Sequence, residues 1–145
     1  MENRKELGMN KIKLMGLALL CIIVTPLSIA AADFDGSKPL LCATIETFEC
    51  GSGIECQRGT AQSINLPQFL KIDFKEKKIS GTRESGEVLT TEIENMERSD
   101  GKLVLQGTQN NKGWSMLINE ATGKMTITAT DDQVGFMVYG ACINP

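Results

Sequence analysis

The chain has 145 residues, a formal net charge of −3 and no histidine. A chain without histidine cannot build a Ser-His-Asp triad or a Cys-His dyad, and the sequence has no GxxxxGK[ST] loop for nucleotide phosphates. An acidic chain without a basic stripe is also a poor nucleic-acid binder, so we expect no nucleic-acid partner.

Residues 1–32 have the layout of a secretory signal peptide. A basic start precedes an apolar run over residues 14–32, which ends in the small residues Ala30-Ala31-Ala32. Pro26 interrupts this run shortly before the predicted cut, where an extended conformation is needed. We therefore expect export to the periplasm or the extracellular space, and one domain of residues 33–145 without stable membrane insertion.

Other interpretations of this leader remain. The apolar run is long enough for an uncleaved membrane anchor, although Pro26 and the Ala-x-Ala ending favour cleavage. Cys21 is a candidate for lipidation, but Leu20 precedes it where lipoprotein signals need a small residue. Translation from Met9 instead of Met1 would make a more compact signal peptide.

The first strand of the exported region is expected at residues 40–50. Apolar Leu41, Ala43 and Ile45 alternate there with Cys42 and polar residues, which is the period of two that indicates a β-strand. Residues 53–61 can run back as its partner.

The remaining pattern predicts a meander. Pro67 places its neighbours at a sheet edge or in a turn, and Ser99-Asp100-Gly101 is a strong hairpin signal. Seven to eight short strands predict an all-β fold, either a single small antiparallel meander barrel or a sandwich. The further expected strands are 69–74, 78–83, 87–98, 102–108, 114–120, 124–130 and 136–142.

Four cysteines lie beyond the predicted leader, and an even number in a small exported domain favours disulfides. Cys50 and Cys56 flank the glycine-containing tip GSGIE, so we pair them, which leaves Cys42 with Cys142. The longer bond would join the first and last strands, as a closed barrel requires.

Metal and redox sites fit this spacing less well. Zinc sites usually place cysteines two to four residues apart and add further Cys or His ligands, whereas five residues separate Cys50 from Cys56. The redox motif C-x-x-C is absent, and Asp131-Asp132 lacks the further oxygen ligands of a calcium site. We expect no metal and no cofactor.

Carboxylates are the remaining route to catalysis. Glu92 and Glu94 lie two residues apart on one strand face, with Glu46 as a candidate neighbour, and paired acids can hydrolyse glycosides. A solvated outer face is the simpler interpretation, so we predict that the protein is not an enzyme.

Three residues are candidates for binding. Trp114 and Tyr139 are the only Trp and Tyr, and Trp114 at a barrel mouth could stack on a ligand. Arg58 could fix an anionic group. The simpler alternatives are core packing for Trp114 and a surface ion pair for Arg58. The GSGIE tip and the NNKG turn are either ordinary turns or loops that insert into a partner.

Three phrases, LPQFLKIDF (66–74), GWSMLINEATGKMTIT (113–128) and VYGAC (138–142), resemble a family of small exported bacterial proteins of unknown function. The likeness spans most of the exported region, including the placement of the cysteines, and implies no activity. The general plan also resembles periplasmic lysozyme inhibitors and lipocalin-like binders, without their diagnostic motifs, and architecture does not fix function.

The sequence therefore predicts an exported, non-enzymatic binding protein. It would act as a protein-binding or inhibitor module on an envelope protein, through turns that disulfides keep rigid. The alternative is a carrier of a small molecule, because an eight-stranded barrel is just wide enough inside for one small ligand.

Overall fold

The computed structural model describes residues 33–145, so the predicted signal peptide, its cleavage site and Cys21 lie outside the described residues. The described chain is all-β, with one short 3₁₀ helix, η1 (Gln62–Ile64). Its ten strands are β1 (Leu40–Gly51), β2 (Gln57–Gly59), β3 (Phe69–Asp73), β4 (Lys78–Thr82), β5 (Val88–Glu92), β6 (Asn95–Ser99), β7 (Lys102–Gln109), β8 (Lys112–Asn119), β9 (Lys124–Thr130) and β10 (Val134–Ile143).

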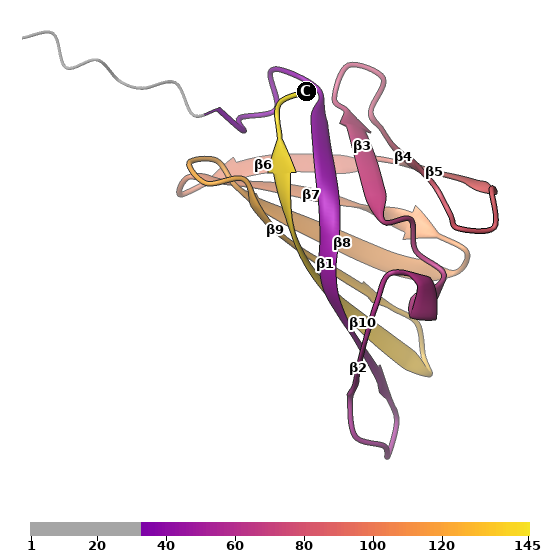
Figure 1. The fold of residues 1–145 in the computed structure, drawn as a ribbon. Helices are drawn as coiled ribbons and strands as arrows, with labels where there is room; N and C mark the ends of the chain where they lie inside the picture. The colour runs from indigo at the N-terminus through magenta and orange to yellow at the C-terminus, as the bar shows by residue number, and fades with distance from the viewer. Residues whose placement is uncertain (1–32) are drawn as a thin grey trace, which may run out of the picture.

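The strands form one antiparallel sheet in the order β5-β4-β3-β1-β10-β9-β8-β7-β6, with β2 paired to β1. The sheet curls into a half-barrel (Figure 1). The all-β antiparallel meander is confirmed, and the first and last long strands pair with each other as expected. The edges of the sheet are β5 and β6, so the half-barrel is open between them.

The predicted strand 87–98 is divided into β5 and β6 because the chain changes its pairing partner. β5 pairs with β4, whereas β6 pairs with β7. At the change, Ile93 donates its backbone N–H to Lys77 at 2.8 Å and Glu94 donates to Gln106 at 2.9 Å. This division and the short β2 bring the number of strands above the predicted seven to eight.

The structure contains both disulfides in the predicted pairing. Cys42 and Cys142 face each other across the β1–β10 ladder and are buried. Cys50 and Cys56 close the loop between β1 and β2, which projects from one end of the molecule in Figure 1. The first bond therefore links the two central strands of the sheet, β1 and β10, and the second constrains the loop between β1 and β2.

Strand β1 turns Leu40, Cys42 and Thr44 inward, while Ile45 stands at a bulge on the outer side. The bulge lies between Thr44 and Glu46 and changes the alternation, so that Thr47 is the next buried residue. The apolar set Leu41, Ala43 and Ile45 therefore does not form the buried side of this strand.

The inner side of the sheet carries a single apolar core, and one end of the half-barrel is closed. Phe34 and Phe74 pack against the core there, and the Phe34 backbone N–H bonds to Glu120 at 3.3 Å. Asn144 donates to the Asp33 carbonyl at 2.8 Å, which joins the start of the described chain to its end. The buried core residues are Leu40, Cys42, Leu70, Ile72, Ile79, Ile93, Leu103, Leu105, Met116, Ile118, Met125, Ile127, Val138 and Cys142.

A candidate ligand cavity at the open end

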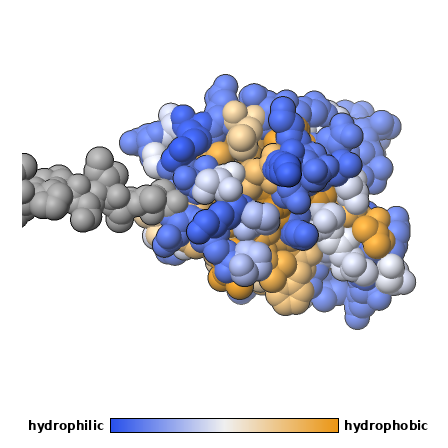
Figure 2. All heavy atoms as spheres, turned by 90° about the horizontal axis from the view of Figure 1, so that it is seen from above, coloured by the Kyte–Doolittle hydropathy of each residue, from blue (hydrophilic) through white to orange (hydrophobic). Residues whose placement is uncertain are grey.

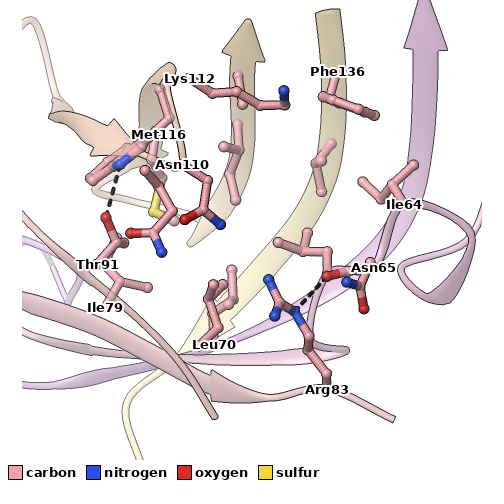
Figure 3. Close-up of a pocket in the computed structure, with 17 residues that line it drawn as sticks. Ile64, Asn65, Leu70, Ile79, Arg83, Thr91, Asn110, Lys112, Met116 and Phe136 are labelled. Atoms are coloured by element: carbon pink, nitrogen blue, oxygen red, sulfur yellow. Dashed lines mark hydrogen bonds between the residues drawn. The ribbon is translucent and has the colours of Figure 1, made fainter. Parts of the chain in front are cut away.

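A cavity of about 240 Å³ lies at the other end of the half-barrel (Figure 3). Eleven of its seventeen lining residues are apolar, so its interior suits an apolar group. The apolar lining residues are Ile64, Leu66, Leu70, Ile79, Leu89, Trp114, Met116, Ile127, Ala129, Phe136 and Val138.

Part of the cavity wall exists because a small residue stands between two aromatic ones. Ala129 of β9 pairs with Trp114 of β8 on one side and with Phe136 of β10 on the other. All three line the cavity. A larger side chain at Ala129 would occupy this space, so the alanine keeps the cavity open.

The segment between β2 and β3 supplies another wall through Ile64, Asn65 and Leu66. Two buried threonines of β1 hold this segment against the sheet. Thr44 Oγ1 donates to the Pro67 carbonyl at 3.4 Å, and Thr47 Oγ1 donates to the Thr60 carbonyl at 3.1 Å. Polar groups on the inner side of β1 therefore position an apolar wall.

Side chains bridge the open seam beside the cavity. Trp114 Nε1 donates to Thr91 Oγ1 at 3.1 Å, which Figure 3 marks with a dashed line. Thr91 Oγ1 in turn lies 3.3 Å from the Thr108 carbonyl. These bonds link β5 to β7 and β8 where no ladder of backbone hydrogen bonds joins them.

Two cations stand at the rim, and each is paired. Arg83 donates from Nε to the Asn65 carbonyl at 2.8 Å and forms an ion pair with Glu87 at 2.5 Å. Lys112 forms an ion pair with Asp131. Both cations belong to the cavity lining, whereas Glu87 does not.

The three predicted binding residues do not meet at one site. Trp114 lines the cavity. Tyr139 lies on the outer face of β10, where its ring meets Phe48 edge-on with centroids 6.2 Å apart. Arg58, with 76% of its side chain exposed, forms an ion pair with Glu46, so the simpler surface interpretation describes its contacts.

Sequence reasoning missed Arg83, Lys112 and Ala129 as cavity residues. Arg83 is the last residue of the predicted strand 78–83 and Lys112 lies in the NNKG turn, where cations usually face solvent. The turn itself is as expected, because Asn110 and Asn111 both adopt positive φ. That these residues face one cavity depends on pairings between distant strands.

The carboxylates considered for catalysis have separate structural partners. Glu94 Oε1 accepts hydrogen bonds from the Thr108 backbone N–H at 3.0 Å and from Thr108 Oγ1 at 2.6 Å, and Glu46 pairs with Arg58. Glu92 lies opposite Lys78 in the β4–β5 ladder. No paired-acid arrangement therefore results among these three residues.

Asp131 organises the turn between β9 and β10. Its carboxylate pairs with Lys112 and accepts the backbone N–H groups of Gln133 and Val134, each at 2.8 Å. The Lys112 ammonium, followed by these two N–H groups, lowers the pKa of Asp131 from 3.8 to about 2. The carboxylate is therefore ionised over the whole physiological range.

Within residues 33–145, no three metal-binding side chains of the His, Cys, Asp or Glu type gather closely enough to hold a metal ion. The same described residues include no helix with the length and hydropathy to cross a membrane.

The outer surface is mainly hydrophilic, with local apolar groups. Figure 2 shows one face on which hydrophilic residues predominate, with apolar residues between them from the middle of the view to its lower edge. Several of the large apolar residues that are exposed belong to β1, β3 and β10, namely Ile45, Phe69, Met137, Tyr139 and Ile143.

Comparison with known proteins found no matching protein-family model and no similar curated protein. The resemblance to a family of small exported proteins therefore stays a prediction.

Proposed function

We propose that the protein is an exported, non-catalytic binding protein that holds one small apolar ligand in its half-barrel. The observation that carries this proposal is the cavity of about 240 Å³ with its mainly apolar lining. A cavity of about 150 Å³ is large enough to bind benzene, so this cavity has room for a somewhat larger group. Trp114 supplies a flat apolar surface in its wall.

Export to the periplasm or the extracellular space belongs to the same proposal. All four cysteines of the described chain are in disulfides, which form and persist in oxidising compartments. Rigid walls would also suit a carrier, because a preformed site avoids the ordering cost of binding.

The test is native mass spectrometry of the protein purified from its own host. We expect added mass on the wild type, its loss in Ala129→Leu, and its retention in Thr128→Leu. Thr128 is the matched control because it is the neighbouring residue of β9 and is exposed on the outer face. Wild-type protein that carries no added mass and shows no saturable change in Trp114 emission with apolar probes would refute the carrier function.

One observation favours a second candidate, binding to an envelope protein. Ile54 is 65% exposed in the projecting loop that the Cys50–Cys56 bond closes. An exposed apolar side chain on a constrained loop suits insertion into a partner, because little ordering is needed.

Capture from an envelope extract at micromolar bait tests this second candidate. We expect Ile54→Asp to lose a partner that the wild type retains. Val88→Asp is the matched control, since Val88 is 64% exposed and lies in β5. A wild type that captures nothing above background would remove this candidate.

A further inference from the structure

The polar residues of the cavity lining include cations but no acid. There are six of them, of which two are cations and four are neutral. The cations are Arg83 and Lys112, which approach the cavity from opposite sides in Figure 3. The acids that pair with them, Glu87 and Asp131, are not part of the lining.

Arg83 is held in place by the fold. Only 13% of its side chain is exposed, and its Nε bond to the Asn65 carbonyl anchors it to the segment that forms one wall. Its partner Glu87 has 63% of its side chain exposed, so water competes strongly for that carboxylate. A guanidinium has five N–H donors in a planar fork that matches a carboxylate.

Lys112 is positioned by two contacts. It pairs with Asp131, and its Nζ lies 5.9 Å from the centre of the Phe136 ring. Because Phe136 also lines the cavity, the ammonium stands where the apolar interior meets the polar rim.

From this arrangement we infer that the ligand is an apolar molecule with an anionic head group, bound with its apolar part inside and its anion at the rim beside Arg83, while Lys112 adds positive charge at the opposite side of the rim. This inference rests on the proposed carrier function. Hydrogen bonds between ionised donors and acceptors are about twice as strong as neutral ones, so an anion gains more at this rim than an alcohol does. A water-sized group, such as a methylene, takes up roughly 30 Å³. The apolar part of a ligand that fills the cavity of about 240 Å³ would therefore contain on the order of eight such groups.

The test uses octanoate and 1-octanol, which have equal chain lengths and differ in the head group. Emission of Trp114, the only tryptophan, reports binding at neutral pH to the folded, disulfide-bonded protein. We expect octanoate to bind at least tenfold more tightly than 1-octanol, with the difference shrinking as salt is added.

Arg83→Met should weaken octanoate binding about tenfold more than it weakens 1-octanol binding, so that the ratio of the two affinities falls. Arg58→Met is the matched control, because Arg58 also pairs with a glutamate but lies on the outer face; it should change neither affinity. Lys112→Met provides a second rim variant if Arg83→Met does not fold.

The wild-type comparison decides between the two proposals. Equal affinities for octanoate and 1-octanol would overturn the anionic head group and leave the carrier function standing. If neither compound gives a saturable change, the anionic inference fails for this chain length. The carrier function then fails as well if the protein from its own host also carries no added mass.

Discussion

Gly107 of β7 decides where the Trp114 ring can lie. A Cβ atom on Gly107 would be 2.5 Å from the Glu92 carbonyl oxygen and 2.6 Å from Cζ2 of Trp114. The carbonyl belongs to the backbone at the seam, so it cannot turn aside as a flexible side chain would. The absence of a side chain at this residue therefore lets β5, β7 and the indole approach one another.

We expect Gly107→Ala to destabilise the protein by about 2 kcal/mol, because overpacking a close contact typically costs about 1 to 3 kcal/mol. Trp114 emission should also change, since the ring must move. Urea unfolding followed by fluorescence measures both effects. Gly113→Ala is the control, because a Cβ there has no neighbour within 4 Å; equal losses in the two variants would contradict this account.

Asp131 contributes stability that depends on pH. Its folded-state pKa of about 2 lies below its ordinary value of 3.8. The carboxylate therefore contributes fully above the unfolded pKa, and this contribution is lost as the pH falls from 3.8 through about 2. Hydrogen bonds from Ser37 also lower the pKa of Asp35, so a difference between variants is needed to isolate Asp131.

We expect Asp131→Asn to be less stable than the wild type at neutral pH, with the difference shrinking as the pH is lowered toward about 2. Urea unfolding of both proteins at a series of pH values measures this difference. A gap that stays constant over that range would show that the Lys112–Asp131 pair is not its source.

At the residue scale, the sequence could have placed Tyr139 correctly. If Cys142 faces the core, then the alternation of β10 turns Gly140 and Val138 inward and Tyr139 outward, as the structure has it. The bulge at Ile45 has no comparable signal, because nothing local distinguishes it from an ordinary strand residue. The residue pattern therefore predicts that a strand is present more reliably than it predicts which side of that strand is buried.

At the scale of elements, the division of residues 88–99 joins the two halves of the sheet. β5 and β6 follow each other directly in the chain but form the two opposite edges of the sheet. The Glu94 carboxylate accepts two hydrogen bonds from Thr108 and so forms a bridge from the β5–β6 connection to β7, beside the bond from the Glu94 backbone N–H to Gln106. This side chain therefore extends the contact between the β6 and β7 chain segments beyond the start of β6.

We expect Glu94→Ala to lower the free energy of unfolding by about 1 kcal/mol. Hydrogen bonds to charged groups contribute roughly 1.5 to 3 kcal/mol, and water weakens these two because they are exposed. Thr108→Val should show coupling with it in a double-mutant cycle by thermal or urea unfolding. Glu97→Ala, on exposed β6, should stay within about 0.5 kcal/mol of the wild type. Additive effects of the Glu94 and Thr108 changes would argue against the bridge.

The turns were predictable, whereas the change of partner was not. Asp100 and Gly101 adopt the positive φ values that a tight hairpin requires, and the sequence marks them plainly. The boundary at Ile93 depends on contacts with Lys77, in the turn before β4, and with Gln106 of β7. Local patterns carry no information about such pairings, so one continuous strand was expected there.

At the scale of the whole molecule, the cavity is a product of topology. Asn65 of the β2–β3 segment, Arg83 of the β4–β5 turn and Lys112 at the start of β8 are brought to one end by the sheet order. The sequence predicted a meander barrel or a sandwich and offered Trp114 as a candidate for a barrel mouth, with core packing as the simpler alternative. The rim itself could not be predicted, because it depends on the pairing of all the strands that lie between its residues. Closure at the opposite end by Phe34 likewise depends on the position of a segment before the first strand.

The two disulfides act on this topology over very different lengths of chain. Cys42 and Cys142 are 100 residues apart, whereas Cys50 and Cys56 are six apart. In the chain-entropy account the long loop contributes about 4 to 5 kcal/mol and the short one roughly 2 kcal/mol.

We therefore expect Cys42→Ala/Cys142→Ala to lose far more stability in urea unfolding than Cys50→Ala/Cys56→Ala. The long bond is also buried in the core that leads to the cavity, so only its loss should weaken the response of Trp114 to ligand. Equal losses in the two double variants would mean that the disulfides stabilise the fold by something other than the length of chain they enclose.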